Sequence, residues 1–225
     1  MTNNDPVQEL AHIRGLMDRS TRFLSLSGLS GVIAGAAALA GAYVAREHYK
    51  ALLWEGRVQD LGSTDEYLPS RWVTEGFSEH VAFLVGDGLV VLLAALLGAG
   101  WFTWRRSQRM GRGLWDASAK RLLVNLMIPL IAGGLFALAL LFNGSVLMVP
   151  AATLVFYGLA LLNASKYTLD EIRWLGLSEA ALGVIAAFWP GAGLLFWALG
   201  FGVLHIFYGG LMYLRYERGS VSGEA

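Results

Sequence analysis

The sequence contains no cysteine and little charge. Charged residues make up only 15% of its 225 residues, whereas soluble domains carry about a quarter. Because cysteine is absent, the chain has no disulfide framework, no thiol nucleophile and no thiolate metal site. The charged residues are also unevenly spread, since long windows of the sequence carry almost none. These features exclude an ordinary soluble domain.

The sequence also lacks the patterns on which common active sites are built. It has no set of nucleophile, base and orienting residue, no cluster of His, Asp and Glu with metal-ligand spacing, and no Gly-rich phosphate loop after a strand. A haem iron usually takes two axial ligands from the protein. The sequence has four histidines, and His205 finds no second ligand among the other three, which lie near different helix ends. We therefore expect a protein that is not an enzyme and that uses no metal and no cofactor.

Long apolar runs are what the sequence has in abundance. A run of about 20 apolar residues crosses a hydrocarbon core roughly 30 Å thick, and in lipid it must be helical because its backbone finds no other hydrogen-bond partners. The sequence therefore predicts an all-α integral membrane bundle of six transmembrane helices. The six runs are 23–44, 81–104, 122–142, 146–164, 174–189 and 194–214.

The basic residues predict how this bundle is oriented. Lys and Arg collect on the cytoplasmic side of membrane proteins. Thirteen of the 17 basic residues lie before the first run, after the last run or in the connections 105–121 and 165–173, which all fall on one side. We therefore expect both termini to be cytoplasmic and the protein to be a multi-pass protein of the bacterial cytoplasmic (inner) membrane.

The six runs pair into three hairpins with polar segments at both ends. An amphipathic helix over 1–22 is expected in the membrane interface, with a docking helix for a cytosolic partner as the alternative. The outer loop 45–79 is expected to cap the bundle or to contact a partner. The segments are the helix 1–22, the first hairpin 23–104, the basic cytoplasmic loop 105–121, the second hairpin 122–164, the third hairpin 165–216 and the polar tail 217–225.

Two features predict how the helices meet one another and the lipid. Ser27, Gly31 and Gly35 recur every four residues and form a small-residue face for close helix packing. The loop 105–121 is basic, so it either binds anionic lipid headgroups or simply anchors the cytoplasmic side. It is too small to build a nucleic-acid-binding fold, and no nucleic acid partner is expected. Its arginines are Arg105, Arg106, Arg109 and Arg112.

Three ionisable residues lie inside the predicted spans, where such residues are functional hypotheses by default. Asp87 is only about 10 Å of helix from the outer end, and is either a proton- or ligand-binding acid or a structural acid near the interface. Glu179 and His205 lie almost equally far from the centre of the turn at 190–193, on facing helices. We expect them to pair, either as a proton-responsive switch or polar pocket or as a structural pair.

A second pair is predicted in the second hairpin. Asn125 and Asn163 are equally far from Gly144, the centre of the turn between their helices. Antiparallel helices then bring both to the same depth near the cytoplasmic side. A hydrogen bond between the two side chains would clamp the hairpin by about 1 kcal/mol.

The hairpins resemble one another and a known family. Phe-Tyr-Gly recurs at 156–158 and 207–209, and units of two helices keep the same orientation in the membrane when they repeat. With its Gly-rich hairpin and the Pro190-Gly191 turn, the stretch 122–216 resembles the HdeD-like family of small bacterial six-helix membrane proteins, which is associated with acid resistance. The segments 19–31 and 157–173 resemble a family of uncharacterised bacterial inner-membrane proteins, which implies topology and no particular chemistry.

These features predict a non-enzymatic membrane module. It would act in the lipid bilayer as a sensing or scaffolding module. Its partner would be a membrane protein, a cytosolic protein or a second copy of itself. The alternative is a small transporter, or a protein that responds to protons or lipid, which uses the Glu179–His205 pair. Transport would depend on these two side chains, whereas scaffolding would depend on the small-residue face or the outer loop.

Overall fold

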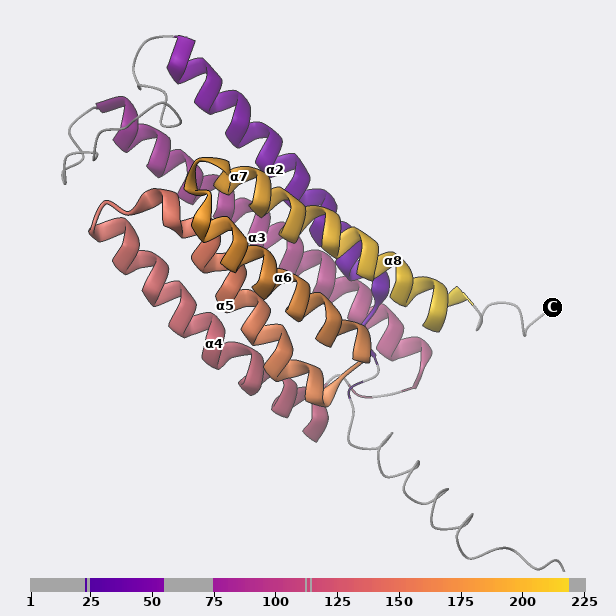
Figure 1. Ribbon diagram of the computed structural model, residues 1–225. Coiled ribbons are helices and arrows are strands. Elements are labelled where there is room, and N and C mark those ends of the chain that lie inside the picture. The colour runs from indigo at the N-terminus through magenta and orange to yellow at the C-terminus, as the bar shows by residue number, and fades with distance from the viewer. Residues whose placement is uncertain (1–22, 24, 55–74, 112, 114, 219–225) are drawn as a thin grey trace, which may run out of the picture.

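The chain folds into a bundle of long helices (Figure 1). The structure is a computed structural model that describes residues 23, 25–54, 75–111, 113 and 115–218. Within these residues every regular element is helical and none is a strand, which confirms the predicted all-α class. The helix expected over 1–22, the central part of the outer loop and the tail from 219 lie outside the described residues.

The described residues form seven α-helices, one π-helix and three short 3-10 turns. The α-helices are α2 (Gly28–Trp54), α3 (Glu75–Arg109), α4 (Ala117–Phe142), α5 (Val149–Ala164), α6 (Asp170–Phe188), α7 (Gly193–Trp197) and α8 (His205–Tyr216). The 3-10 turns are Val146–Met148, Ser165–Tyr167 and Pro190–Ala192, and the π-helix Ala198–Leu204 joins α7 to α8.

Five stretches of the described chain are long and apolar enough to cross a membrane. The fifth predicted run, 174–189, corresponds to α6, which is not among these five because it carries several charged residues, including Glu171 and Glu179. It nevertheless packs within the bundle, between α5 and α8 (Figure 1). The five stretches are Gly28–Ala51, Val81–Arg109, Ala117–Phe142, Val146–Tyr167 and Pro190–Tyr216.

The first apolar helix begins later than its sequence predicts. The apolar run starts at Phe23, but α2 starts at Gly28. The backbone N–H of Phe23 donates to the carbonyl of Tyr167 at 2.7 Å, and its own carbonyl accepts from the Thr168 hydroxyl at 2.9 Å. Because the turn between α5 and α6 satisfies both backbone groups of Phe23, this segment does not need helical hydrogen bonds.

The last apolar helix is interrupted where the sequence predicts a continuous one. It begins at Gly193, widens into the π-helix over Ala198–Leu204 and returns to α-helical geometry at His205. π-Helical segments are rare and are frequently found at functional sites. This one lies directly before one of the predicted intramembrane residues.

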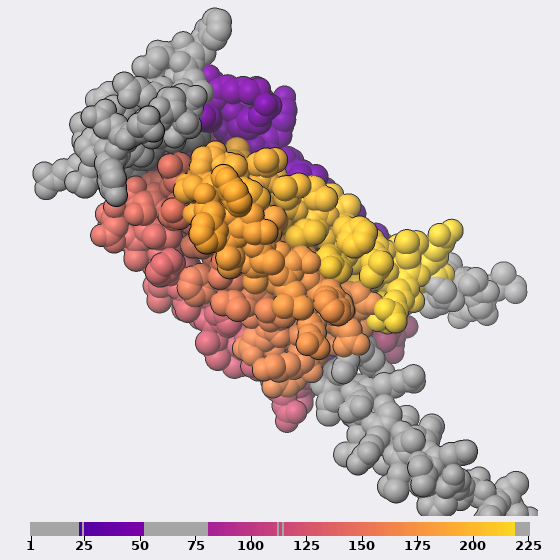
Figure 2. Space-filling model, viewed as in Figure 1, coloured from indigo at the N-terminus to yellow at the C-terminus, as the bar shows by residue number. Residues whose placement is uncertain are grey.

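The buried core lies around α5, α6 and α8. A smaller cluster of Ala151, Leu154 and Ala186 lies between α5 and α6 near the turn that precedes α7. On the face shown in Figure 2 the orange surface of α6 adjoins the yellow surface of α8. In contrast, α3 and α4 leave most of their apolar side chains exposed, as suits helices that face lipid. The main core cluster consists of Leu161, Leu169, Ile172, Leu175 and Met212.

Glycines bring α5 and α6 into backbone contact. A Cβ added to Gly158 would lie 2.5 Å from the backbone nitrogen of Ala180, and one added to Gly176 would lie 2.8 Å from the carbonyl oxygen of Gly158. Farther along the same interface, a Cβ on Gly183 would lie 2.7 Å from the backbone nitrogen of Val155. Any larger side chain would push these helices apart, so α5 and α6 form one closely packed pair.

The predicted small-residue face of the first helix packs inside the chain in the same way. A Cβ on Gly31 would lie 3.1 Å from the Cα of Gly209 on α8, and one on Gly35 would lie 2.6 Å from the carbonyl oxygen of Gly202 in the π-helix. Ser27 lies directly before the first residue of α2 and is buried. The face is therefore filled by α8 and the π-helix of the same chain.

Candidate functional site

Glu179 and His205 meet inside the bundle. Glu179 lies on α6 and is 0% exposed, and His205 is the first residue of α8 and is 6% exposed. The Nδ1 atom of His205 lies 3.2 Å from Oε1 of Glu179. The two residues that their sequence positions place at matching depth are therefore in direct contact.

His205 is held by two further groups. Its Nδ1 lies 3.1 Å from the carbonyl oxygen of Gly200, and its Nε2 lies 2.8 Å from the hydroxyl oxygen of Tyr157 on α5. A carbonyl only accepts hydrogen bonds, so Nδ1 carries a hydrogen and donates it. In a neutral imidazole Nε2 is then an acceptor, and the Tyr157 hydroxyl donates to it. Tyr157 belongs to another hairpin, and counting residues from the turn does not identify it.

The carboxylate of Glu179 has no hydrogen bond of good geometry. Although Nδ1 of His205 is close, its N–H is directed at the Gly200 carbonyl, and among the described residues neither carboxyl oxygen of Glu179 has a hydrogen-bond partner. A buried ionised carboxylate without donors is costly. Glu179 therefore depends on its own proton or on a positive charge on His205.

The π-helix reaches the carboxylate with its backbone. A Cβ added to Gly200 would collide with Oε2 of Glu179 and with the side chain of Leu154. Glycine allows this close approach without displacing the two side chains. The ring of Phe201, the next residue, packs against the ring of Tyr157 with 5.0 Å between the ring centroids.

The chemistry open to this cluster is proton binding. With one shared proton the pair is neutral overall, as a carboxylic acid beside imidazole or as a carboxylate beside imidazolium. Loss of that proton leaves a negative charge on Glu179, and gain of a second proton leaves a positive charge on His205. Either charged state places an uncompensated charge in a buried site.

Asp87 lies apart from this pair. It is half-buried on α3 and faces α2, where a Cβ on Gly41 would lie 3.1 Å from its Oδ2 atom. No hydrogen bond or ion pair within the described chain joins Asp87 to Glu179 or His205. The three predicted intramembrane residues are thus one pair and one separate acid.

Asn125 and Asn163 are in contact, but the contact is between the side chain of Asn163 and the backbone of Asn125. Nδ2 of Asn163 donates to the backbone carbonyl of Asn125 at 2.9 Å, and Nδ2 of Asn125 donates to the carbonyl of Arg121 at 2.8 Å. In α4 the carbonyl of Asn125 would normally accept from residue 129, which is Pro129 and has no N–H. The predicted pair of side chains is therefore corrected to a side chain that satisfies a backbone carbonyl left open by proline.

Not all four of the arginines predicted to bind lipid headgroups face outward. Arg105 and Arg109 are exposed at the end of α3, and Arg112 lies outside the described residues. The side chain of Arg106 is only 12% exposed, its Nη1 lies 3.3 Å from Oε1 of Glu217, and it also donates to the carbonyl of Leu26. Arg106 therefore joins helix ends instead of facing headgroups.

Glu217, just past α8, caps the start of α2. Its carboxylate accepts from the backbone N–H of Gly28 at 2.6 Å and from the hydroxyl of Ser27 at 3.1 and 3.2 Å. The first N–H groups of a helix have no partner within the helix, and the positive end of the helix dipole favours a carboxylate. Ser27 is thus a buried residue whose hydroxyl donates to the capping carboxylate.

A second buried acid ties α6 to α8 near the same end. Oε1 of Glu171 accepts from Nη1 of Arg215 at 2.9 Å and from the hydroxyl of Tyr216 at 3.1 Å. Glu171 is buried although it lies in the first turn of α6. The signal in the sequence is its position, since it and Arg215 lie at the same end of the paired runs 174–189 and 194–214.

No protein-family model, no curated protein and no solved structure matches this chain. The resemblances to HdeD-like proteins and to the uncharacterised inner-membrane family therefore stay predictions. Among the described residues no group of three or more His, Cys, Asp and Glu side chains is placed to hold a metal ion.

Proposed function

We propose that this protein is a non-enzymatic membrane protein that responds to protons through Glu179 and His205. The observation that carries this proposal is the Glu179 carboxylate, which is fully buried, has no hydrogen-bond partner and lies 3.2 Å from Nδ1 of His205. Such a carboxylate is stable only while one proton is held on it or on its partner. The pair is therefore a site where a change of pH acts on the inside of the bundle.

We also propose that α6 is a sixth span, so that the helices form three hairpins with both ends of the chain in the cytoplasm of a bacterium. The distribution of Lys and Arg supports this orientation. The location of α6 between α5 and α8 supports the count, because its acids Glu171 and Glu179 are turned toward basic partners in the bundle. In this arrangement Arg106 and Glu217 lie at the cytoplasmic end.

Sensing is better supported than scaffolding through the small-residue face. That face would have to be free to bind a second protein, but Gly31 and Gly35 are already covered by α8 and the π-helix. A partner or a second copy would instead use the exposed surfaces of α3 and α4, the outer loop or the segment 1–22. The regions from 55 to 74 and from 1 to 22 lie outside the described residues.

Infrared difference spectroscopy of the full chain in lipid nanodiscs tests the proton site. Spectra are recorded across about pH 5 to 8, where histidine commonly changes charge. We expect the wild type to show a change in the band of a buried carboxylic acid that is lost in Glu179→Gln. Asp87→Asn is the matched control, since it removes another acid of an apolar helix and should keep the band change.

The reverse result would end the proposal. If Glu179→Gln keeps the same band change as the wild type, the titrating acid is a different residue. If the wild type shows no change of a buried carboxyl group over this range, the pair is a permanent structural contact. Size-exclusion chromatography and circular dichroism establish that each variant is folded, and His205→Gln serves as a second variant of the pair.

A further inference from the structure

The bundle contains two closely packed helix groups, and α6 of the first group meets the π-helix and α8 of the second along a seam. In the first group α5 and α6 meet through Gly158 and Gly176, and in the second α2 meets the π-helix and α8 through Gly35 and Gly209. Backbone atoms are in contact in both groups, so neither can shift far without separating. Between α6 and the π-helix, the close glycine contact is that of Gly200 with the side chain of Glu179, and within the described chain no glycine there brings backbone against backbone.

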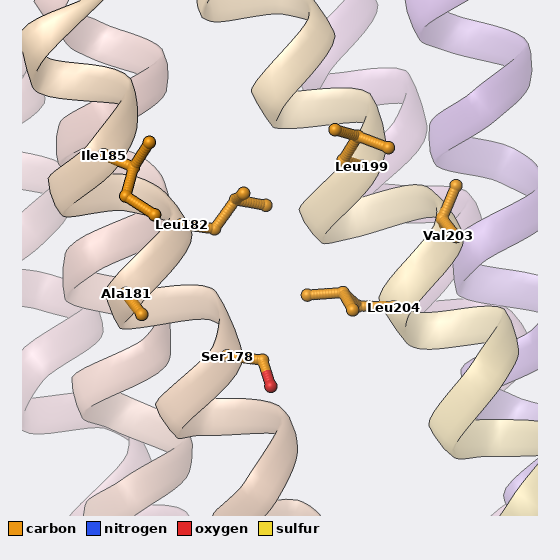
Figure 3. A pocket seen from close by; sticks show the side chains of 7 residues that line it. All are labelled: Ser178, Ala181, Leu182, Ile185, Leu199, Val203 and Leu204. Carbon is orange, nitrogen blue, oxygen red and sulfur yellow. The ribbon is translucent and has the colours of Figure 1, made fainter.

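An apolar groove of about 330 Å³ runs along this seam (Figure 3). Leu182 of α6 and Leu204 of the π-helix point toward each other from its two walls. Ser178 stands at one end and contributes the only polar side chain of the lining. The lining residues are Ser178, Ala181, Leu182 and Ile185 on α6 and Leu199, Val203 and Leu204 on the π-helix.

The main core cluster and several polar contacts hold the two groups together. His205 of α8 contacts Glu179 of α6 at 3.2 Å and Tyr157 of α5 at 2.8 Å. At the other end of the seam, Arg215 of α8 pairs with Glu171 of α6 at 2.9 Å. The titratable side chains that contact His205 are thus Glu179 and Tyr157, while α2 approaches it at Gly31, which has no side chain.

We infer that the seam between α6 and the π-helix opens when the Glu179–His205 pair loses its shared proton. This inference rests on the proposed proton site. Without that proton the Glu179 carboxylate stands beside the Gly200 backbone without a donor, and it becomes stable only if water reaches it. Ser178 and Leu204 line the groove and are the sequence neighbours of Glu179 and His205, so opening of the groove would bring water near the pair.

The two groups make the movement local. Closely packed helices move as units because their interfaces are not continuously deformable. The glycine contacts keep α5 with α6 and α2 with the π-helix and α8. The change is therefore taken up at the interface between the two groups, where the π-helix faces α6.

Spin-label distances measure this opening directly. The chain contains no cysteine, so labels attach only to introduced cysteines. Ala181→Cys with Val203→Cys places labels on the two walls of the seam, where both side chains are exposed. Leu159→Cys with Leu177→Cys is the matched control, since these exposed residues lie next to the glycine contact of α5 with α6.

We expect the distance across the seam to shift to longer values from acidic to alkaline pH and the control distance to stay constant. In the Glu179→Gln background the distance across the seam should no longer depend on pH. If the infrared band of Glu179 changes with pH but the seam distance does not, the inference is wrong and the proton site stands. If the distance across the seam changes with pH in the Glu179→Gln background as much as in the wild type, the inference is also wrong, since another group would then drive the movement.

Discussion

Replacing Gly158 by alanine should weaken the α5–α6 pair. The added Cβ would lie 2.5 Å from the nitrogen of Ala180, 2.7 Å from the carbonyl oxygen of Gly176 and 2.9 Å from the Cα of Ala180. These are backbone atoms that cannot rotate away, so the helices must separate by about 1 Å to restore normal contact distances. Overpacking of this kind costs about 1–3 kcal/mol, which lowers Tm by roughly 2–12 °C for a chain of this length.

Thermal unfolding in nanodiscs, followed by circular dichroism, measures this loss. Gly134→Ala on α4 is the control, because nothing lies within 4 Å of its added Cβ and alanine favours the helix over glycine. Gly31→Ala should fall between the two, since its nearest contact would be 3.1 Å. If Gly158→Ala is as stable as Gly134→Ala, the backbones of α5 and α6 are not in contact and the reasoning is refuted.

Two further predictions concern polar contacts between helices. Asn163→Ala should lower the free energy of unfolding by about 0.5–1.5 kcal/mol. The loss should be smaller in a Pro129→Ala background, because the new N–H of residue 129 can donate to the Asn125 carbonyl. Equal losses in both backgrounds would contradict this account. Glu217→Ala should destabilise the first turn of α2 by about 0.5–2 kcal/mol, and Glu217→Gln by less because its amide oxygen still accepts from Gly28. Hydrogen exchange in that turn measures the effect, and unchanged exchange would exclude the cap.

The apolar runs predict where helices lie but not where they are irregular. The late start of α2 depends on Tyr167 and Glu217, which are far away in sequence and whose contact with this segment no local pattern shows. The π-helix likewise has no signature in the hydrophobic pattern, because a run of apolar residues reads the same in either helix geometry. These features depend on packing between helices, which cannot be predicted from the hydrophobic periodicity of one helix.

The candidate site could be predicted in part for a geometric reason. Helices rise by about 1.5 Å per residue, so equal counts from a tight turn bring Glu179 and His205 to the same depth. The same count also predicts that Asn125 and Asn163 lie at the same depth. It does not predict that the side chain of Asn163 bonds to the backbone carbonyl of Asn125. Tyr157 comes from a different hairpin, and its place beside His205 depends on how the hairpins pack.

The contact between α2 and α8 also bears on the order in which the protein assembles. α2 is made early and α8 late, yet Gly31 is covered by Gly209, and the first turn of α2 is capped by Glu217. During synthesis α2 can pack against α3, but its small-residue face stays open until α8 is made. Closure of this bundle is a late event that joins two distant parts of the chain, so a chain that stops before α8 leaves α2 uncapped and its small-residue face uncovered.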